Sequence, residues 1–123
     1  MTTPSMIILY VADARRAAAF WSDLLGAAPI ELSDTFAMLP LNPATRLGLW
    51  GIAGVEPSTT TCGGGGEIAI AVADPAEVDA THAAWAARGR AILQPPTAMD
   101  FGRTFTAADP DGHRIRVFCP AEG

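Results

Sequence analysis

One eight-residue segment occurs twice in this chain, and it restricts the possible folds more than any other feature. Residues 6–13 read MIILYVAD and residues 67–74 read EIAIAVAD, with identical residues at the second, sixth, seventh and eighth positions. Apolar residues at helical spacing follow each copy, with Gly26 as the stop after the first and Gly89 as the stop after the second. The sequence therefore predicts a duplicated strand–helix unit.

Three short strand candidates follow each expected helix. They lie at about 28–32, 35–40 and 46–51 in the first half, and at about 91–95, 101–108 and 114–119 in the second. The segment between the halves, EPSTTTCGGGG, has the composition of a flexible connector. We therefore predict an α+β fold with two βαβββ modules, residues 5–53 and 67–120, joined by a linker at 54–66 within a single domain of residues 1–123.

Alternate residues of a strand point to opposite faces of a sheet, so the repeated strands can be sorted into two sets. One set is wholly aliphatic and is expected to face the helices: Ile7, Leu9, Val11, Leu47, Leu49, Ile68, Ile70, Val72, Ile115 and Val117. The other set mixes aromatic, small and charged side chains: Met6, Ile8, Tyr10, Arg46, Gly48, Trp50, Glu67, Ala69, Ala71, Arg114, Arg116 and Phe118. A core would not tolerate this mixture and a solvated face would not need it. We interpret the second set as the concave face of a mixed sheet whose helices lie on the outer face; a half-exposed sheet or a dimer seam is the alternative.

The charge balance indicates which classes of binding partner to expect. The formal net charge is -5 and all eight basic residues are Arg, which disfavours nucleic acid and anionic membranes and favours a small molecule or another protein. The apolar stretch at 6–11 is too short for a signal peptide or a membrane span, so a cytoplasmic protein is expected. Cys62 and Cys119 form neither a metal spacing nor a disulfide framework and are interpreted as reduced thiols.

Three motifs could be mistaken for catalytic signals. The glycine run at 63–66 lacks the Gly-Lys-Ser/Thr of a phosphate loop and precedes an expected strand. The Asp-Pro-Asp-Gly sequence at 109–112 has the composition of a tight turn between strands, which we prefer to paired acid/base carboxylates. His82 and His113 have no nearby Ser, Cys or second His in the sequence and are expected to be structural or solvated.

The repeat, with VADARRAAAFWSDLLG near the start and DPDGHRIRVF near the end, resembles the vicinal oxygen chelate superfamily. This superfamily includes glyoxalases, extradiol dioxygenases, fosfomycin-modifying enzymes and bleomycin-binding proteins. The resemblance covers essentially the whole chain. It implies paired βαβββ modules, usually assembled as a homodimer with the site in the concave sheet.

The same resemblance locates the positions of the superfamily's metal ligands. In metal-dependent members, His or Glu ligands lie where this chain has Met6, Gly48, Glu67 and Arg116. Of these, Glu67 alone is a usual ligand for a divalent metal, so we expect neither a metal ligand set nor another cofactor. Because the enzymatic chemistry depends on the metal, enzymatic activity becomes less expected. Glu67 and Arg116 share the mixed face, and we predict that they form an ion pair; the alternative is that each faces water.

Three segments are similar to phenazine antibiotic resistance proteins: DFGRTFTAADPDGHRIRV, LGLWG and FAMLPL. This similarity implies non-enzymatic binding and sequestration of a planar aromatic antibiotic. The expected ligand-binding residues are Trp50, Tyr10, Phe36, Met38, Phe101, Phe105, Phe118, Arg46, Arg116 and Glu67, with no catalytic residue. Trp50 is the preferred stacking platform, Phe101 and Phe105 are expected to share a strand face, and an Arg is expected to receive a carboxylate or phenol. The alternatives are a metal-dependent glyoxalase or dioxygenase-type enzyme, and a ligand-sensing or interaction module.

Overall fold

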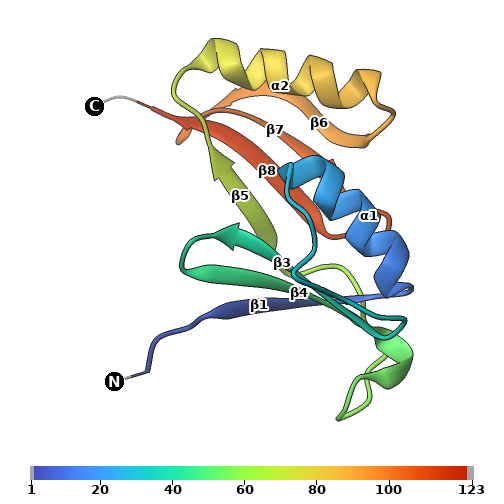
Figure 1. Ribbon diagram of the computed structural model, residues 1–123. Coiled ribbons are helices and arrows are strands. Elements are labelled where there is room, and N and C mark those ends of the chain that lie inside the picture. Colours follow the sequence, from blue (N-terminus) through green and yellow to red (C-terminus); the bar gives the residue numbers. More distant parts are fainter. Residues whose placement is uncertain (1, 122–123) are drawn as a thin grey trace. The chain divides into compact units, whose positions relative to one another are not determined.

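The computed structural model describes residues 2–121 and consists of two compact units, Met1–Gly63 and Gly64–Gly123 (Figure 1). The boundary between the units lies inside the predicted linker at 54–66. Each unit has its own helix and its own four-stranded mixed sheet, so the predicted α+β class is confirmed. The combination of both sheets into one concave face stays a prediction.

The first unit has one helix packed on a sheet with the strand order β1-β4-β3-β2. Its elements are β1 (Met6–Val11), α1 (Ala14–Leu25), β2 (Glu31–Leu32), β3 (Phe36–Asn42), β4 (Thr45–Gly51) and a 3₁₀ helix, η1 (Ile52–Gly54). Strand β1 runs parallel to β4, whereas β3 is antiparallel to both of its neighbours. The strand predicted at 28–32 is reduced to the two residues of β2.

The second unit repeats this arrangement with the strand order β5-β8-β7-β6. Its elements are β5 (Glu67–Ala71), α2 (Pro75–Ala87), β6 (Ala91–Met99), β7 (Gly102–Ala108) and β8 (Arg114–Pro120). Strand β5 runs parallel to β8, and β7 is antiparallel to β6 and β8. The duplicated βαβββ order is therefore confirmed, although β6 extends four residues beyond the predicted end at residue 95.

The last residue of the repeated segment explains why each strand is followed by a helix. The Asp13 carboxylate accepts hydrogen bonds from the backbone N–H groups of Arg15 and Arg16 at 3.0 and 3.1 Å. The Asp74 carboxylate likewise accepts from the backbone N–H of Glu77 at 2.9 Å. An aspartate at this position satisfies N–H groups that a helix leaves unpaired at its start, which is typically worth about 1 kcal/mol.

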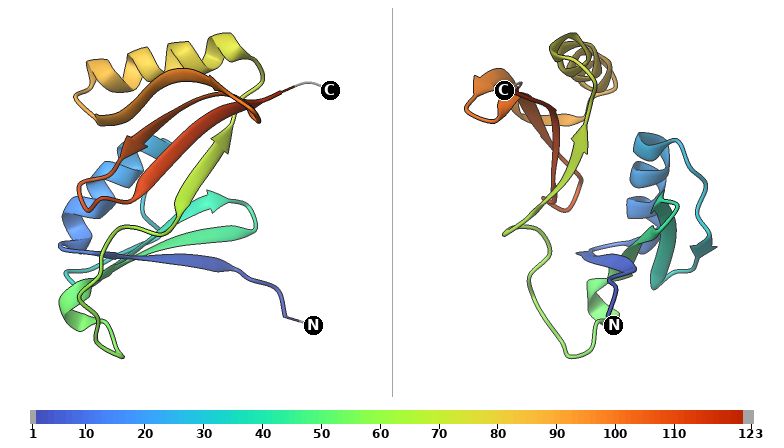
Figure 2. Two further views of the ribbon diagram at one scale, coloured as in Figure 1. Left: turned by 180° about the vertical axis from the view of Figure 1, so that it is seen from behind. Right: turned by 90° about the vertical axis from the view of Figure 1, so that its left-hand side faces the viewer.

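The aliphatic face lies under the helices, as the strand alternation predicted. Helix α1 covers β3 and β4 with the fully buried Trp21, and α2 covers β6, β7 and β8 (Figure 2). The predicted core residues that are fully buried are Val11, Leu47, Leu49, Ile115 and Val117. Coverage is weaker on β1 and β5, because these strands lie at the edges of their sheets: Ile7 is 42% exposed. Each fully buried aliphatic side chain contributes roughly 1.5–3 kcal/mol by leaving water.

Candidate functional site

The mixed face of the first unit carries a group of large apolar side chains, which we call the aromatic surface: Met6, Tyr10, Phe36, Met38 and Trp50. Strand pairing brings them together, because Trp50 of β4 lies opposite both Tyr10 of β1 and Phe36 of β3. The Tyr10 and Trp50 rings meet edge to face with centroids 6.5 Å apart. All five side chains are half-buried, so each keeps area for a ligand.

Gly48 lies beneath this surface and gives it room. A Cβ atom at Gly48 would lie 3.0 Å from Cζ of Phe36 and 3.2 Å from Sδ of Met6, both closer than ordinary van der Waals contact. The Phe36 ring and the Met6 thioether therefore extend over bare backbone. The superfamily resemblance makes Gly48 a lost metal-ligand position, and the structure shows that this glycine lets two apolar side chains lie close to the sheet.

Arg46 lies at one end of the aromatic surface, paired in register with Met6 and Pro40, and is exposed to solvent. Its positive charge is therefore exposed beside this surface. That an Arg of the mixed face receives an acidic group of a ligand stays a prediction.

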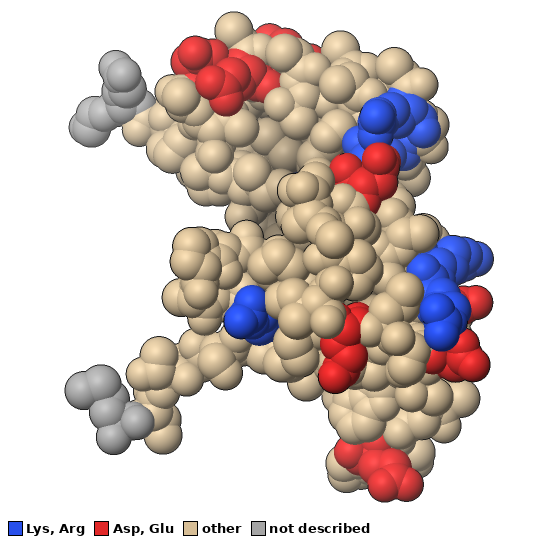
Figure 3. Space-filling model, in the orientation of Figure 1, with Lys and Arg blue, Asp and Glu red and all other residues tan. Residues whose placement is uncertain are grey.

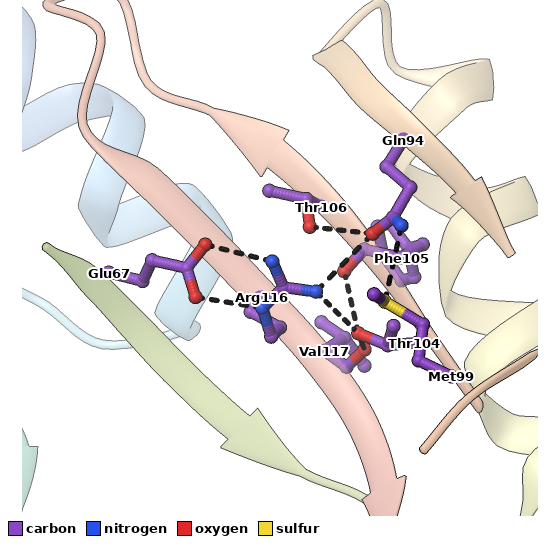
Figure 4. Close-up of polar contacts among 8 residues, drawn as sticks. All are labelled: Glu67, Gln94, Met99, Thr104, Phe105, Thr106, Arg116 and Val117. Atoms are coloured by element: carbon purple, nitrogen blue, oxygen red, sulfur yellow. Dashed lines mark hydrogen bonds and ion pairs between the residues drawn. The ribbon is translucent and has the colours of Figure 1, made fainter. Parts of the chain in front are cut away.

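The mixed face of the second unit is polar, and we call its connected residues the polar surface: Glu67, Gln94, Thr104, Thr106 and Arg116 (Figure 4). Arg116 Nε donates to Glu67 Oε1 at 2.7 Å, and Arg116 Nη2 donates to Glu67 Oε2 at 2.9 Å. The predicted ion pair is therefore confirmed, with the two-point geometry that gives such pairs their strength. The side chains of Arg116 and Glu67 are 19% and 30% exposed, so water screens the pair only in part.

A hydrogen-bond network extends from the third nitrogen of Arg116. Arg116 Nη1 donates to Gln94 Oε1 at 3.3 Å and to Thr104 Oγ1 at 3.2 Å. Thr106 Oγ1 donates to the same Gln94 oxygen at 3.1 Å, and Thr104 Oγ1 donates to the carbonyl of Val117 at 2.9 Å. Sequence reasoning missed Gln94, Thr104 and Thr106. Thr104 and Thr106 alternate with apolar residues along β7, so strand parity would have found these two.

The ion pair fixes the charge state of both partners. The hydrogen bond from Arg116 is the main cause that holds the pKa of Glu67 below its usual range. The hydrogen bond to Glu67 is the main cause that raises the pKa of Arg116. Both groups are therefore charged at neutral pH and cancel each other, so Arg116 is a poor receptor for a ligand carboxylate.

The predicted aromatic residues of the second unit fall on opposite faces. Phe101 and Phe118 meet edge to face at 6.2 Å on the polar side, where the Arg116 guanidinium lies 5.7 Å from the Phe101 ring. Phe105 is 0% exposed and packs against Trp85 and His82 of α2, at 5.3 and 5.4 Å.

The prediction that Phe101 and Phe105 share a face is therefore wrong, and Phe105 belongs to the core rather than to a ligand site. The physical reason is that Phe101 precedes β7, which begins at Gly102 with φ of +135°. The alternation of strand residues does not continue through that backbone conformation.

The metal implied by the superfamily does not fit the side chains at the corresponding positions. Gly48 offers no donor atom, Met6 packs its sulfur toward Gly48, and both carboxylate oxygens of Glu67 accept hydrogen bonds from Arg116. Within residues 2–121, no three His, Cys, Asp or Glu side chains gather where they could hold a metal ion.

Most of the Arg groups visible in Figure 3 lie next to acidic groups, and much of the face shown is uncharged.

Among the helices of the described part of the chain, none has the length and apolar character needed to cross a membrane.

Comparison with known proteins extends these observations. The chain is 27% identical to the phenazine antibiotic resistance protein EhpR of Enterobacter agglomerans, over 98% of this chain and 93% of that protein. It is 48% identical to protein ATC0852 of Agrobacterium tumefaciens, whose solution NMR structure matches 99% of this chain and 100% of that one with a TM-score of 0.90.

A glyoxalase/bleomycin resistance protein/dioxygenase from Nocardioides is 23% identical and shares the fold, with a TM-score of 0.85 over 100% of this chain and 86% of that chain. The family model of the Glyoxalase/Bleomycin resistance protein/Dioxygenase superfamily matches residues 3–117. The chain therefore belongs to the glyoxalase/bleomycin resistance protein/dioxygenase superfamily.

Proposed function

We propose that this protein binds a planar aromatic molecule of the phenazine type and sequesters it without changing it covalently. The observation that carries the proposal is the aromatic surface, on which Phe36 lies over Gly48 and Trp50 remains half-buried. The relative named as a phenazine antibiotic resistance protein supports the same class of ligand.

Flat side chains that are already in position favour a flat ligand. A planar ring gains from the apolar area removed from water, at about 25 cal/mol per Å², and each aromatic pair adds about 0.5–1.5 kcal/mol. The strand pairing of Tyr10, Phe36 and Trp50 sets these side chains before a ligand arrives, so little side-chain freedom is lost on binding.

The donor chemistry argues against a metal-dependent glyoxalase or dioxygenase-type reaction. Such a reaction needs ligands that hold a Lewis-acidic ion. Gly48 has no side chain, and both oxygens of Glu67 are engaged by Arg116. A ligand-sensing role would use the same aromatic surface. It differs from sequestration in requiring a partner that responds to the bound state.

The proposal includes a homodimer in the cytoplasm, in keeping with the assembly that the superfamily resemblance implies. Sedimentation equilibrium tests the dimer: a species of twice the 12.8 kDa chain mass supports it, and a monomer at micromolar concentration contradicts it.

Isothermal titration calorimetry with phenazine tests the binding site. Trp50→Ala removes the preferred stacking ring, and we expect the affinity to fall roughly tenfold to a hundredfold, from the loss of about 1.5–3 kcal/mol of apolar and ring contact. Phe20→Ala is the matched control, because Phe20 lies on α1, where its ring meets Trp21 rather than the aromatic surface. We expect this control to bind like the wild type.

Two results would contradict the proposal: no heat of binding with the wild type, or equal affinities for the wild type and Trp50→Ala. Chromatography of the ligand recovered after long incubation tests sequestration separately. Unchanged phenazine is expected, and a new product would instead favour an enzyme.

A further inference from the structure

We infer that Gln94 is a specificity-determining residue: its side-chain amide donates a hydrogen bond to a neutral acceptor on the planar aromatic ligand, either a ring nitrogen or a carbonyl oxygen. This inference rests on the proposed function for the class of ligand, a planar aromatic molecule, and adds the kind of polar atom that such a ligand carries when it contacts the second unit. It concerns the polar surface of the second unit alone.

The neighbours of Gln94 determine the orientation of its amide group. Arg116 has no acceptor atom, so the Gln94 atom that lies 3.3 Å from Arg116 Nη1 must be the oxygen. The hydroxyl of Thr106 donates to the same oxygen at 3.1 Å. A flipped amide would turn its NH₂ group toward Arg116, which cannot accept a hydrogen bond, so the oxygen stays on the Arg116 side and the NH₂ group points away from Arg116 (Figure 4).

The NH₂ group is a strong donor that has only a weak partner. Within residues 2–121, Gln94 Nε2 contacts one acceptor, the Sδ atom of Met99, at 3.5 Å. A thioether sulfur accepts hydrogen bonds weakly, and Met99 is a flexible side chain that is 45% exposed. A nitrogen or oxygen acceptor on a ligand would therefore replace this contact with a net gain.

The charges around Gln94 select a neutral acceptor over an anionic one. Arg116 is the nearest cation, but Glu67 compensates its charge through two hydrogen bonds, and its remaining nitrogen, Nη1, serves Gln94 and Thr104. A ligand carboxylate would lose its hydration and gain little from this neutralised pair. A heteroaromatic nitrogen or a carbonyl loses much less hydration on binding.

An aromatic side chain lies beside Arg116, the residue that also binds Gln94. The Arg116 guanidinium that contacts Gln94 also lies 5.7 Å from the Phe101 ring, and Phe101 is 44% exposed. Phe101 in turn meets Phe118 edge to face. A planar ligand that accepts from Gln94 therefore has an exposed ring available for apolar contact on the same face.

The test compares two tricyclic molecules of the same shape, phenazine and anthracene, of which only phenazine has acceptor nitrogens. Protein is titrated into a trace of each ligand, with phenazine followed by its absorbance and anthracene by its fluorescence. We expect the wild type to bind phenazine roughly three- to tenfold more tightly, which corresponds to one hydrogen bond. Gln94→Met, which keeps the size but has no donor, is expected to reduce this preference to about one.

A second variant removes the NH₂ donor but keeps an oxygen for the hydrogen-bond network. Gln94→Glu keeps an oxygen for Arg116 and Thr106 and replaces the NH₂ group with an acceptor. It is also expected to lose the preference for phenazine. The wild-type comparison itself needs no variant, so it remains decisive if a variant does not fold.

The outcomes distinguish this inference from the proposed function. Equal wild-type affinities for phenazine and anthracene, or a preference that survives in both Gln94 variants, would overturn the role of Gln94 and leave aromatic binding intact. Failure of the wild type to bind either molecule would overturn both.

Discussion

Gly102→Ala is a substitution for which the structure predicts a large loss of stability. Gly102 begins β7 with φ of +135°, and a Cβ atom there would meet the carbonyl oxygen of Cys119 and the backbone nitrogen of Ala121. Both obstacles are backbone atoms, and the segment that contains them is tied by a hydrogen bond of 2.8 Å from Ala121 N–H to the Phe101 carbonyl. Neither can move as the end of a flexible side chain would.

Two costs add at this position. A non-glycine residue at positive φ costs about 1–2 kcal/mol, and overpacking against a fixed neighbour costs about 1–3 kcal/mol more. We therefore expect Gly102→Ala to lower the free energy of unfolding by about 3 kcal/mol. For a chain of this length, that corresponds to a melting temperature lower by roughly 10–15 °C.

Gly112→Ala is the matched control. Gly112 also has positive φ, at +86°, but an added Cβ would meet nothing within 4 Å. It should therefore lose only about 1 kcal/mol. Urea unfolding of both variants, followed by circular dichroism, measures the difference. If Gly102→Ala is no less stable than Gly112→Ala, this result would contradict the close approach of backbone atoms to Gly102 at the start of β7.

Two further predictions concern the polar surface. Glu67→Gln should lower the free energy of unfolding by about 1 kcal/mol at pH 7, because it breaks a partly screened ion pair. The pKa of Glu67 is lowered in the folded state, so this stabilisation is complete above the unfolded-state pKa near 4.5 and is lost as the pH falls through the lower folded-state pKa. Urea titrations at pH 7 and pH 3 should show the difference shrinking, and an undiminished difference at pH 3 would argue against the pair. Thr106→Val keeps the shape of a buried side chain but removes the hydroxyl that donates to Gln94. We expect this variant to lower the free energy of unfolding by about 1 kcal/mol. If the same urea titration finds the variant as stable as the wild type, this hydrogen bond does not stabilise the fold.

Much of the fold could be predicted because β1, β4, β5 and β8 are regular. Their pairing has no register shift, so simple alternation assigned Leu47 and Val117 to the core and Trp50 and Arg116 to the other face. The sequence repeat was also informative, since its final aspartate caps a helix in both units.

Alternation failed where the backbone is irregular. The alternation of strand faces does not extend to Phe101, because Gly102 interrupts the strand conformation before β7. Gln94 lies between two register shifts in the β6–β7 pairing, so its face could not be obtained by counting residues. Its role depends on contacts with Thr106 and Arg116, residues 12 and 22 positions away in the chain.

The most direct measurement of ligand binding at Trp50 uses the three tryptophans as reporters. In an NMR titration of ¹⁵N-labelled protein with phenazine, each tryptophan gives its own indole N–H signal. Trp50 is half-buried on the aromatic surface, whereas Trp21 and Trp85 are buried against the helix side of the sheets. We predict that the Trp50 signal shifts in a saturable way while the signals of Trp21 and Trp85 stay in place. A saturable shift at Trp21 or Trp85 with Trp50 unmoved, or no shift at all, would contradict the account.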